Sequence, residues 1–377
     1  MAPSRSAALR NVFIAFFVVG LGAALLPWAL RTVQTQAVSD KVYVAEEGSG
    51  SVAVINVATN TVQATIPLAT SETAFMAHNV QVAPDQRSVW VTANAMAGMD
   101  HSDMASHGDS EPSAPDALIV LDPRTDTIIR RIPIAAGLHL AHVVLTPDSA
   151  AAIAVAQEAG KVFKIDAKTY AVSQTVDLPA GSQPHGLRIT PNGTTAYIAL
   201  MGSKTLGVLD LATFTITYQP LGGVPVQTAV TPDGAYAAAS LFDTKQLALY
   251  DVARKEVHYV ALPAKANGPL QIYPSPDSQR MYVADQGNYF GQPDGSVVYV
   301  IDIATQSVTQ TIAAGTAPHG VVVSPDGRTL YVTNLVSNDV SVIDTQSGRE
   351  IARIPTGSKP NGISYWQQPA AERSLGR

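Results

Sequence analysis

The chain has 377 residues, a formal net charge of −6 at pH 7, few charged residues and no cysteine. The mild, unclustered negative charge lacks the basic footprint of nucleic-acid-binding proteins, so no DNA or RNA partner is expected. The lack of cysteine excludes disulfides, thiolate zinc sites, cysteine nucleophiles and c-type haem attachment, so His, Met, Asp or Glu must hold any metal. Frequent Gly and Pro suit many short strands joined by turns.

The N-terminal 37 residues are predicted to be separate from the fold. Arg5 and Arg10 precede residues 12–30, an uncharged stretch of nineteen residues. This is longer than a usual signal-peptide core of about 7–15 residues and about long enough to span a bilayer. We expect residues 1–37 to be a signal peptide cleaved after Ala37 or an uncleaved anchor in the inner membrane. The basic N-terminal side then places the rest of the chain in the periplasm or otherwise outside the cytoplasm.

The sequence beyond residue 38 contains an internal repeat of strand and turn patterns. A strand that ends in Pro-Asp or Pro-Asn recurs six times, with prolines at 84, 147, 191, 232, 276 and 325, spaced by 63, 44, 41, 44 and 49 residues. A second strand follows each of these turns. A third, apolar strand then recurs seven times and ends on Asn56, Asp122, Asp166, Asp210, Asp251, Asp302 and Asp344. These side chains are expected to hydrogen-bond the backbone of the next turn, which is a structural role.

Four strands in about 40–45 residues is the period of a propeller blade. Six units are complete, and the seventh is divided between residues 41–68, which supply three strands, and residues 361–366, which supply the first strand. Joining the two ends in one blade closes the ring without a free edge. We therefore predict an all-β fold for residues 38–377, a seven-bladed β-propeller with four-stranded blades, preceded by an N-terminal hydrophobic helix.

One repeat carries a family resemblance. Residues 331–334 are Tyr-Val-Thr-Asn, and SPDGRTLYVTN followed by VSVIDTQSG resembles the repeat of the YVTN family of seven-bladed β-propellers. Members are typically exported bacterial proteins, and the resemblance extends from residue 41 to 366. It implies the fold and an extracytoplasmic location. It implies no single chemistry, because the family includes surface proteins, binding proteins and enzyme-like members.

A loop insertion at residues 95–115 accounts for the longest spacing. It holds three of the seven methionines, together with two histidines: Met96, Met99, His101, Met104 and His107. Thioethers select Cu(I), and imidazoles bind Cu(II) or Zn(II). The spacing is similar to Met/His-rich segments of copper-resistance and copper-carrier proteins, which implies a copper-binding loop. The alternative is a solvated polar spacer.

The histidines cluster at one kind of junction. Five of the eight fall where the fourth strand of a blade leads into the first strand of the next: His78, His139, His142, His185 and His319. First strands line a propeller's channel, and this junction opens on the same face as the second-to-third loops. We therefore expect a partial ring of metal-binding histidines at one channel mouth, on the face of the Met/His-rich loop. The alternative is that these histidines only hydrogen-bond neighbouring strands.

Other side chains are predicted at the same mouth. Met76 lies two residues before His78, and second-to-third loops offer further ligands: Glu46, Glu47, Met201, Asp243 and Asp285. The histidine ring, these side chains and the loop together predict an exported binding protein with a copper ion as its cofactor. A closed propeller can stand alone, so we expect a monomer, which holds copper or exchanges it with another exported protein. This function requires no turnover.

Two other function classes stay open. One is an enzyme, a lactonase-like or tetrapyrrole-binding propeller, whose channel histidines act as acid/base groups or axial ligands. The sequence lacks a nucleophile elbow, HExxH and a paired-carboxylate motif. Propeller enzymes, however, assemble their sites from separate blades, so missing linear motifs weigh little. The other class is a protein-interaction scaffold without metal.

Overall fold

A computed structural model describes residues 39–96 and 114–370. The chain divides into a short unit, Met1–Gln36, and a large one, Ala37–Arg377. The predicted N-terminal helix and most of the 95–115 loop lie outside the described residues. Within the described ranges, no helix has the length and hydrophobicity that a membrane span requires.

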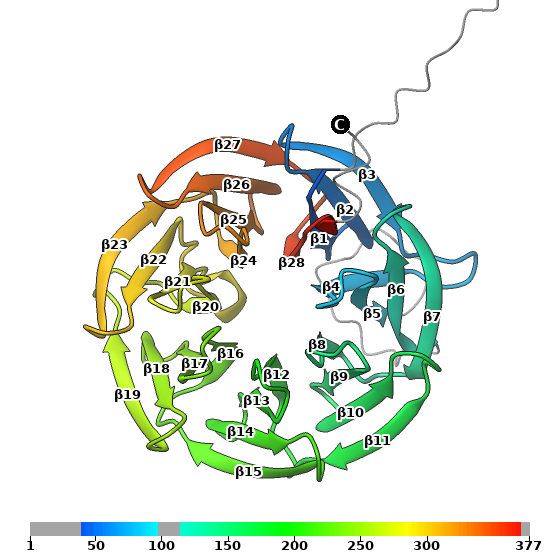
Figure 1. Ribbon diagram of the computed structural model, residues 1–377, viewed down its shortest axis with the longest axis horizontal. Coiled ribbons are helices and arrows are strands. Elements are labelled where there is room, and N and C mark those ends of the chain that lie inside the picture. The colour runs from blue at the N-terminus through cyan, green and yellow to red at the C-terminus, as the bar shows by residue number, and fades with distance from the viewer. Residues whose placement is uncertain (1–38, 97–113, 371–377) are drawn as a thin grey trace, which may run out of the picture. The chain divides into compact units, whose positions relative to one another are not determined.

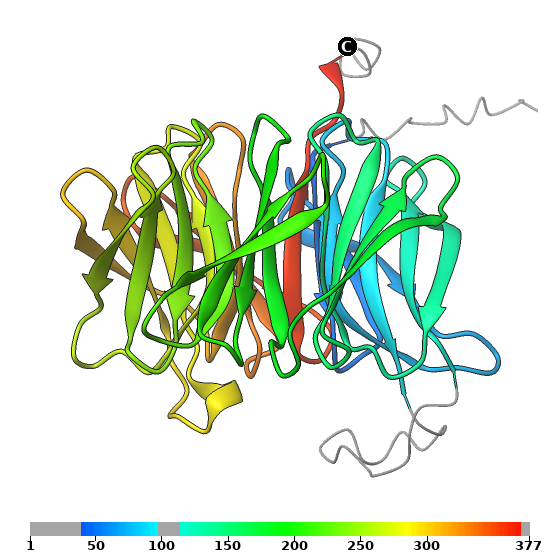
Figure 2. The ribbon, with the colours of Figure 1, turned by 90° about the horizontal axis from the view of Figure 1, so that it is seen from below.

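The described part of the large unit forms seven antiparallel, four-stranded sheets around a central channel (Figure 1). Each sheet is a blade. In six blades the four strands follow the chain from the channel outward, whereas the innermost strand of the seventh comes from the C-terminal end of the propeller. The prediction of a seven-bladed β-propeller with four-stranded blades is therefore confirmed. Figure 2 shows the blades from the side, with their connecting loops gathered on two opposite faces.

The two inner strands of each blade are almost completely buried. The first strands, which line the channel, are β28 (Pro360–Trp366), β4 (Phe75–Val82), β8 (Leu140–Leu145), β12 (Pro184–Ile189), β16 (Pro225–Val230), β20 (Pro269–Pro274) and β24 (Pro318–Val323). The second strands are β1 (Lys41–Glu46), β5 (Val89–Ala95), β9 (Ala151–Ala156), β13 (Thr195–Leu200), β17 (Tyr236–Leu241), β21 (Arg280–Asp285) and β25 (Thr329–Asn334). The second strands pack on both faces, so their sequences are mostly apolar or small residues, whereas the first strands also carry buried polar side chains toward the channel.

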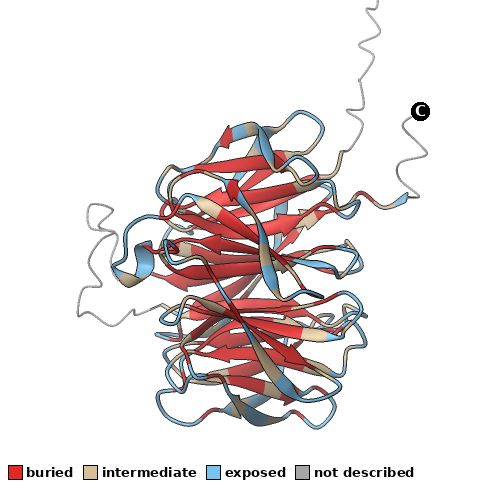
Figure 3. Cartoon of the chain, turned by 90° about the vertical axis from the view of Figure 1, so that its left-hand side faces the viewer, coloured by how far each residue is buried: buried red, intermediate tan, exposed pale blue. Residues whose placement is uncertain are grey.

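Burial decreases toward the outside of each blade: the third strands are mostly buried, and the fourth strands are largely exposed (Figure 3). The third strands are β2 (Ser51–Asn56), β6 (Asp116–Asp122), β10 (Lys161–Asp166), β14 (Thr205–Asp210), β18 (Gln246–Asp251), β22 (Val297–Asp302) and β26 (Asp339–Asp344). The fourth strands are β3 (Thr61–Pro67), β7 (Thr127–Ala135), β11 (Val172–Asp177), β15 (Thr215–Pro220), β19 (Glu256–Ala261), β23 (Ser307–Ala313) and β27 (Arg349–Pro355). The fourth strands alternate apolar and polar residues because one side faces solvent.

The acidic residues that end the third strands have the predicted structural role. Asp210 Oδ1, for example, accepts hydrogen bonds from the backbone N–H groups of Ala212 (3.0 Å) and Thr213 (2.7 Å). Asp166 does the same for the turn that follows β10. These contacts fix the turns between the third and fourth strands. Because the carboxylates accept these backbone hydrogen bonds, they are not candidates for the functional site.

The ring closes by strand pairing between the two ends of the propeller. β28 pairs antiparallel with β1, in the register Lys41 with Trp366 and Tyr43 with Ser364. Trp366 is fully buried, and its indole N–H donates a hydrogen bond to the backbone oxygen of Gln86 in the next blade (2.9 Å). The predicted division of one blade between the two ends is therefore confirmed.

Candidate functional site

Four of the predicted histidines sit at irregularities of the channel-lining strands. His78, His142, His185 and His319 each fall inside a β-bulge, where pairing with the second strand shifts register. A bulge leaves residues unpaired and re-aims their side chains. Consecutive residues can therefore both face the channel, which strict alternation along a strand would prevent.

A close strand approach accompanies the bulges. Gly320 follows His319, and a Cβ at this position would lie 2.3 Å from the backbone oxygen of Asn361 on the neighbouring strand β28. Gly186 follows His185 and faces Gln227 at a similarly forbidden distance. The two Pro-His-Gly sequences thus let adjacent first strands approach while the histidine turns into the channel.

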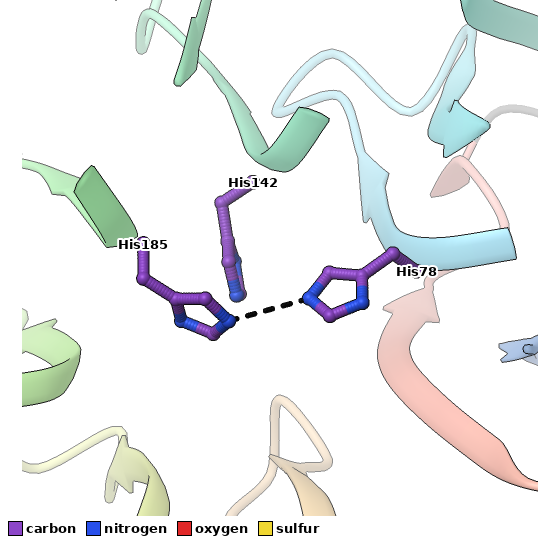
Figure 4. A group of neighbouring side chains, drawn as sticks. All are labelled: His78, His142 and His185. Atoms are coloured by element: carbon purple, nitrogen blue, oxygen red, sulfur yellow. Dashed lines mark hydrogen bonds between the residues drawn. The ribbon is translucent and has the colours of Figure 1, made fainter. Parts of the chain in front are cut away.

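Three histidines from three consecutive blades converge (Figure 4). One ring nitrogen from each of His78, His142 and His185 lies within 4.8 Å of the others. The Nε2 atoms of His78 and His185 are 3.3 Å apart. His142 lies one position deeper in the channel than the other two, and all three side chains are buried. This spacing allows the three residues to hold one metal ion.

The other ring nitrogen of His185 fixes its tautomer. Nδ1 lies 3.0 Å from the backbone oxygen of Val226, and an imidazole nitrogen in contact with a carbonyl must be the donor. Neutral His185 therefore carries its proton on Nδ1. Its Nε2 presents a lone pair to His78, which is the form that binds a metal ion.

His78 is backed by a carboxylate. Glu47, in the loop between β1 and β2, places Oε2 3.8 Å from His78 Nδ1. The same oxygen accepts hydrogen bonds from the Tyr289 hydroxyl (2.7 Å) and the Asn361 side-chain amide (2.5 Å). Burial by itself raises the pKa of Glu47, but His78, Tyr289 and Asn361 together hold it well below its ordinary value. Glu47 is therefore a fixed negative charge behind the imidazole.

The imidazoles of His142, His185 and His319 are neutral at neutral pH. Burial, reinforced by the other histidines, lowers the pKa values of His142 and His185 well below the ordinary 6.5. Burial and His78 lower the pKa of His319 to about 3, although Glu47 acts in the opposite direction. His142 Nδ1 and His319 Nε2 are buried without a hydrogen-bond partner in the described part of the chain. Unpaired buried polar atoms are costly and call for a ligand or a water.

The histidines open into a cavity of about 290 Å³ at one channel mouth. Thioethers of Met76 and Met201 line it beside His78, His139, His185 and His319. The short helix η1 (Asn288–Phe290) forms part of its rim, held by a stack of Phe290 on Phe242 with ring centroids 3.6 Å apart. The cavity therefore combines imidazole, carboxylate and thioether donors.

The predicted site residues divide into two groups. His78, His139, His185 and His319 line this cavity. His142 does not line it, but its ring centroid lies 6.1 Å from that of His78 and 5.2 Å from that of His185. Met96 is described at the end of β5, where its backbone N–H donates to Ala74 (3.0 Å), and it is not among the residues lining the cavity. Met99, His101, Met104 and His107 lie outside the described residues. Metal ligation by either group stays a prediction.

Three of the acidic residues expected at this mouth accept hydrogen bonds from backbone N–H groups. Glu46 accepts from the N–H of Gly357, Asp243 from Val224, and Asp285 from Gly268. Only Glu47 and Met201 of the loop residues expected at this mouth line the cavity. The sequence offered these three carboxylates as further ligands because it places them in loops on this face, but it does not show which backbone groups they must satisfy.

Tyr289 and Phe290 also line the cavity and were not predicted from the sequence. Both lie in the connection between β21 and β22, whose extra length contributes to the 49-residue spacing of the last two turn prolines. That spacing was the one available signal. Tyr289 also packs edge-on against His319, with ring centroids 5.4 Å apart.

Comparison with known proteins agrees with this architecture. The family model of the YNCE-like beta-propellers matches residues 161–373. Two curated relatives, both called uncharacterized protein YncE, from Salmonella typhimurium and Salmonella typhi, are 33% identical over 88 residues. These matches cover 23% of this chain and 24% of each relative, so the chain spans about a quarter of the length of the curated relatives it matches.

Solved structures with similar folds have diverged far in sequence. Kuenenia stuttgartiensis hydrazine synthase is 16% identical, with a TM-score of 0.61 over 76% of this chain and 89% of its own. A protein of unknown function from Desulfotomaculum acetoxidans is 15% identical, with a TM-score of 0.68 over 88% and 100%. Virginiamycin B lyase from Staphylococcus aureus is 15% identical, with a TM-score of 0.60 over 77% and 91%. At these identities the likeness shows the fold alone. The family match, together with the seven-bladed architecture, establishes that the chain belongs to the YNCE-like β-propeller family.

Proposed function

We propose that this protein binds a copper ion at one mouth of the propeller channel, with His78, His142 and His185 as the primary ligands. The observation that carries the proposal is the convergence of their ring nitrogens, all within 4.8 Å of one another. Binding or transfer of the ion requires no turnover. The nearby His139 and His319 supply further imidazoles at the same mouth.

The distance between the two outer ligands supports a single ion. Two nitrogens bound at about 2.0–2.1 Å to one tetrahedral ion lie about 3.3 Å apart. The Nε2 atoms of His78 and His185 are separated by 3.3 Å. The separations among the three nitrogens extend to 4.8 Å, so the ligand set closes by a modest side-chain movement when the ion binds.

The surroundings of His78 and His185 also favour a metal site. Metal-bound histidines usually donate their second ring N–H to a carboxylate or a backbone carbonyl, which fixes the tautomer and the ring orientation. Val226 supplies that carbonyl to His185, and Glu47 supplies a carboxylate on the Nδ1 side of His78. Neutral imidazoles do not have to lose a proton before they bind.

The thioethers favour copper over zinc. Imidazole accepts copper, zinc and nickel, whereas a thioether is a soft ligand that selects Cu(I). Met76 and Met201 line the same cavity as the histidines. The pattern of Met96, Met99, His101, Met104 and His107 has the same preference, so we propose that the 95–115 loop captures copper for the channel site.

The N-terminal sequence supports a location outside the cytoplasm. The uncharged residues 12–30 behind Arg5 and Arg10 support a propeller in the periplasm, attached to the inner membrane or released from it. There the protein, as a monomer, would receive copper from another exported protein or deliver it to one.

The experiment is a competitive titration of the full chain, freed of metal, with Cu(I) and separately with Zn(II). We expect one tightly bound Cu(I) per chain and weaker Zn(II). The variant His185→Asn tests the channel site, and His258→Asn on the outer strand β19 is the matched control. A further variant with the five Met and His residues of the loop changed to Ser tests the loop. Equal copper binding by wild type and His185→Asn would contradict the channel site.

An acid–base enzyme is the second candidate, because Glu47 lies behind His78 as a carboxylate behind a general base does. A histidine-to-alanine variant of virginiamycin B lyase is catalytically inactive. The two functions differ in their response to chelation. An enzyme that uses only acid–base chemistry retains its activity in excess chelator, whereas copper binding is abolished.

A further inference from the structure

The channel has a second mouth with a different chemistry. A cavity of about 490 Å³ lies where the first strands end, at the opposite end from the histidines. Its rim is formed by the repeated turn prolines, from Pro84 to Pro325, and apolar side chains such as Val144, Ile189 and Val230 line its walls. None of the residues that line this cavity lines the histidine cavity.

Polar side chains separate the two cavities. Gln227 donates its side-chain amide to Gln271 (2.5 Å), and the same nitrogen lies 3.3 Å from His142 Nε2. All three side chains are buried. A ligand in the proline-rimmed cavity therefore lies on the far side of this layer from the histidine cavity.

Arg188 is the one charged residue among the described residues that line this second cavity. Its guanidinium donates a hydrogen bond to the backbone oxygen of its own neighbour Leu187 (2.8 Å). No described carboxylate lies within 4.0 Å of it, whereas Arg254 and Arg353 pair with acidic side chains at 2.7 Å. Burial lowers the pKa of Arg188, and Tyr273 opposes that shift. The guanidinium stays charged, because arginine is not deprotonated in proteins.

A second donor lies in the same part of the channel. Tyr273 on β20 lines the cavity three residues before its turn proline, as Arg188 does on β12. Its hydroxyl makes no hydrogen bond to the described part of the chain. Burial raises the pKa of Tyr273, while Arg188 lowers it, so the phenol is a neutral donor beside a fixed positive charge.

We propose that the proline-rimmed cavity binds a small organic carboxylic acid through Arg188, with the Tyr273 hydroxyl as a second donor. A guanidinium with free N–H groups matches a carboxylate in two parallel hydrogen bonds. An inorganic anion would satisfy the charge but leave the apolar walls uncovered. A cavity of about 490 Å³ is in the range of small-molecule sites, about 300–1,000 Å³, and its walls suit an aromatic or aliphatic body.

Calorimetric titration of the full chain with benzoate tests the proposal, with benzamide as the uncharged ligand of equal shape and inorganic phosphate as the anion without an apolar body. We expect one benzoate per chain, bound at least about tenfold more tightly than benzamide, since a hydrogen bond to a charged group contributes that much. Phosphate is expected to bind more weakly than benzoate.

Variants assign the binding to the cavity. Arg188→Met should weaken benzoate binding about tenfold or more, and Arg188→Lys should fall between it and wild type because it keeps the charge without the planar fork. The control Arg87→Met changes an exposed arginine that does not line the cavity, and should bind like wild type. Far-ultraviolet circular dichroism checks that each variant is folded. Equal affinity for benzoate and benzamide, tighter phosphate binding, or unchanged benzoate affinity in folded Arg188→Met overturns the proposal.

Discussion

His78 and His185 face each other with their Nε2 atoms 3.3 Å apart, although 107 residues separate them in the chain. They belong to β4 and β12, the first strands of two blades that flank the blade of His142. A contact with the backbone oxygen of Val226 orients His185, and the Glu47 carboxylate lies 3.8 Å behind His78, so both rings are placed for the proposed ion. Such preorganisation lowers the entropic cost of binding.

The carboxylate behind His78 should tune the affinity for copper. Changing Glu47→Gln keeps the shape of the side chain but removes its charge, so His78 becomes a weaker donor to the metal. We expect copper affinity to fall about 10- to 100-fold, the usual effect of losing such a partner. The measurement is the same competitive titration, with the exposed Glu72→Gln as control. Unchanged affinity in Glu47→Gln would show that the carboxylate does not act on the metal ligand.

The hydroxyl of Tyr289, which contacts Glu47, should affect copper affinity less than the Glu47 carboxylate does. Tyr289→Phe removes one hydrogen bond to the carboxylate and retains the ring that packs on His319. We expect a loss of copper affinity smaller than that of Glu47→Gln, because the charge stays. A larger loss than Glu47→Gln would mean that Tyr289 itself contacts the ion.

The buried neutral histidines should make the metal-free protein sensitive to mild acid. Their pKa values are lowered in the folded state, so below the unfolded value of 6.5 the unfolded chain binds more protons and stability falls as the pH falls. Each fully buried histidine then costs about 1 kcal/mol at pH 5.5.

Denaturant unfolding of the metal-free full chain at pH 7.5 and 5.5 measures this effect. The variant with His142, His185 and His319 changed to Gln should lose less stability over the same interval than wild type does. His258→Gln is the control for a histidine outside the cluster. An identical pH dependence in wild type and the triple variant would show that the cluster is protonated or solvated in the folded protein.

Ring closure by the last strand should carry a large share of the stability. Trp366 is fully buried and hydrogen-bonds Gln86 across the closing blade. Trp366→Ala should lower the free energy of unfolding by about 3–5 kcal/mol, as large-to-small changes in a core do. Tyr218→Ala on the outer strand β15, where the side chain is 42% exposed, should change it by about 0.5 kcal/mol or less. A Trp366→Ala variant as stable as wild type would contradict closure through β28.

The sequence predicts the fold almost completely because each blade repeats the same turn chemistry. The turn prolines from 84 to 325 and the terminal Asn or Asp of each third strand mark every blade. Counting back from those prolines also places His78, His185 and His319 at one mouth. A repeat fixes the position of a residue in the blade, and closure of the ring then fixes which positions meet.

The details of the site depend on contacts that a repeat does not encode. His142 is one position out of step with the ring, and the bulge between Leu140 and Val143 is what turns it toward the channel. Tyr289 reaches Glu47 across 242 residues from an irregular loop. Neither the register shift nor the path of that loop has a periodic signal in the sequence.

Crystals of the full chain grown with copper, with diffraction recorded on both sides of the copper absorption edge, would show whether the channel histidines bind the ion. We expect an anomalous peak inside the channel mouth, about 2.0–2.2 Å from Nε2 of both His78 and His185, and no such peak in the same position with His185→Asn. A peak only elsewhere on the protein, or none at all, would contradict copper binding by the channel histidines.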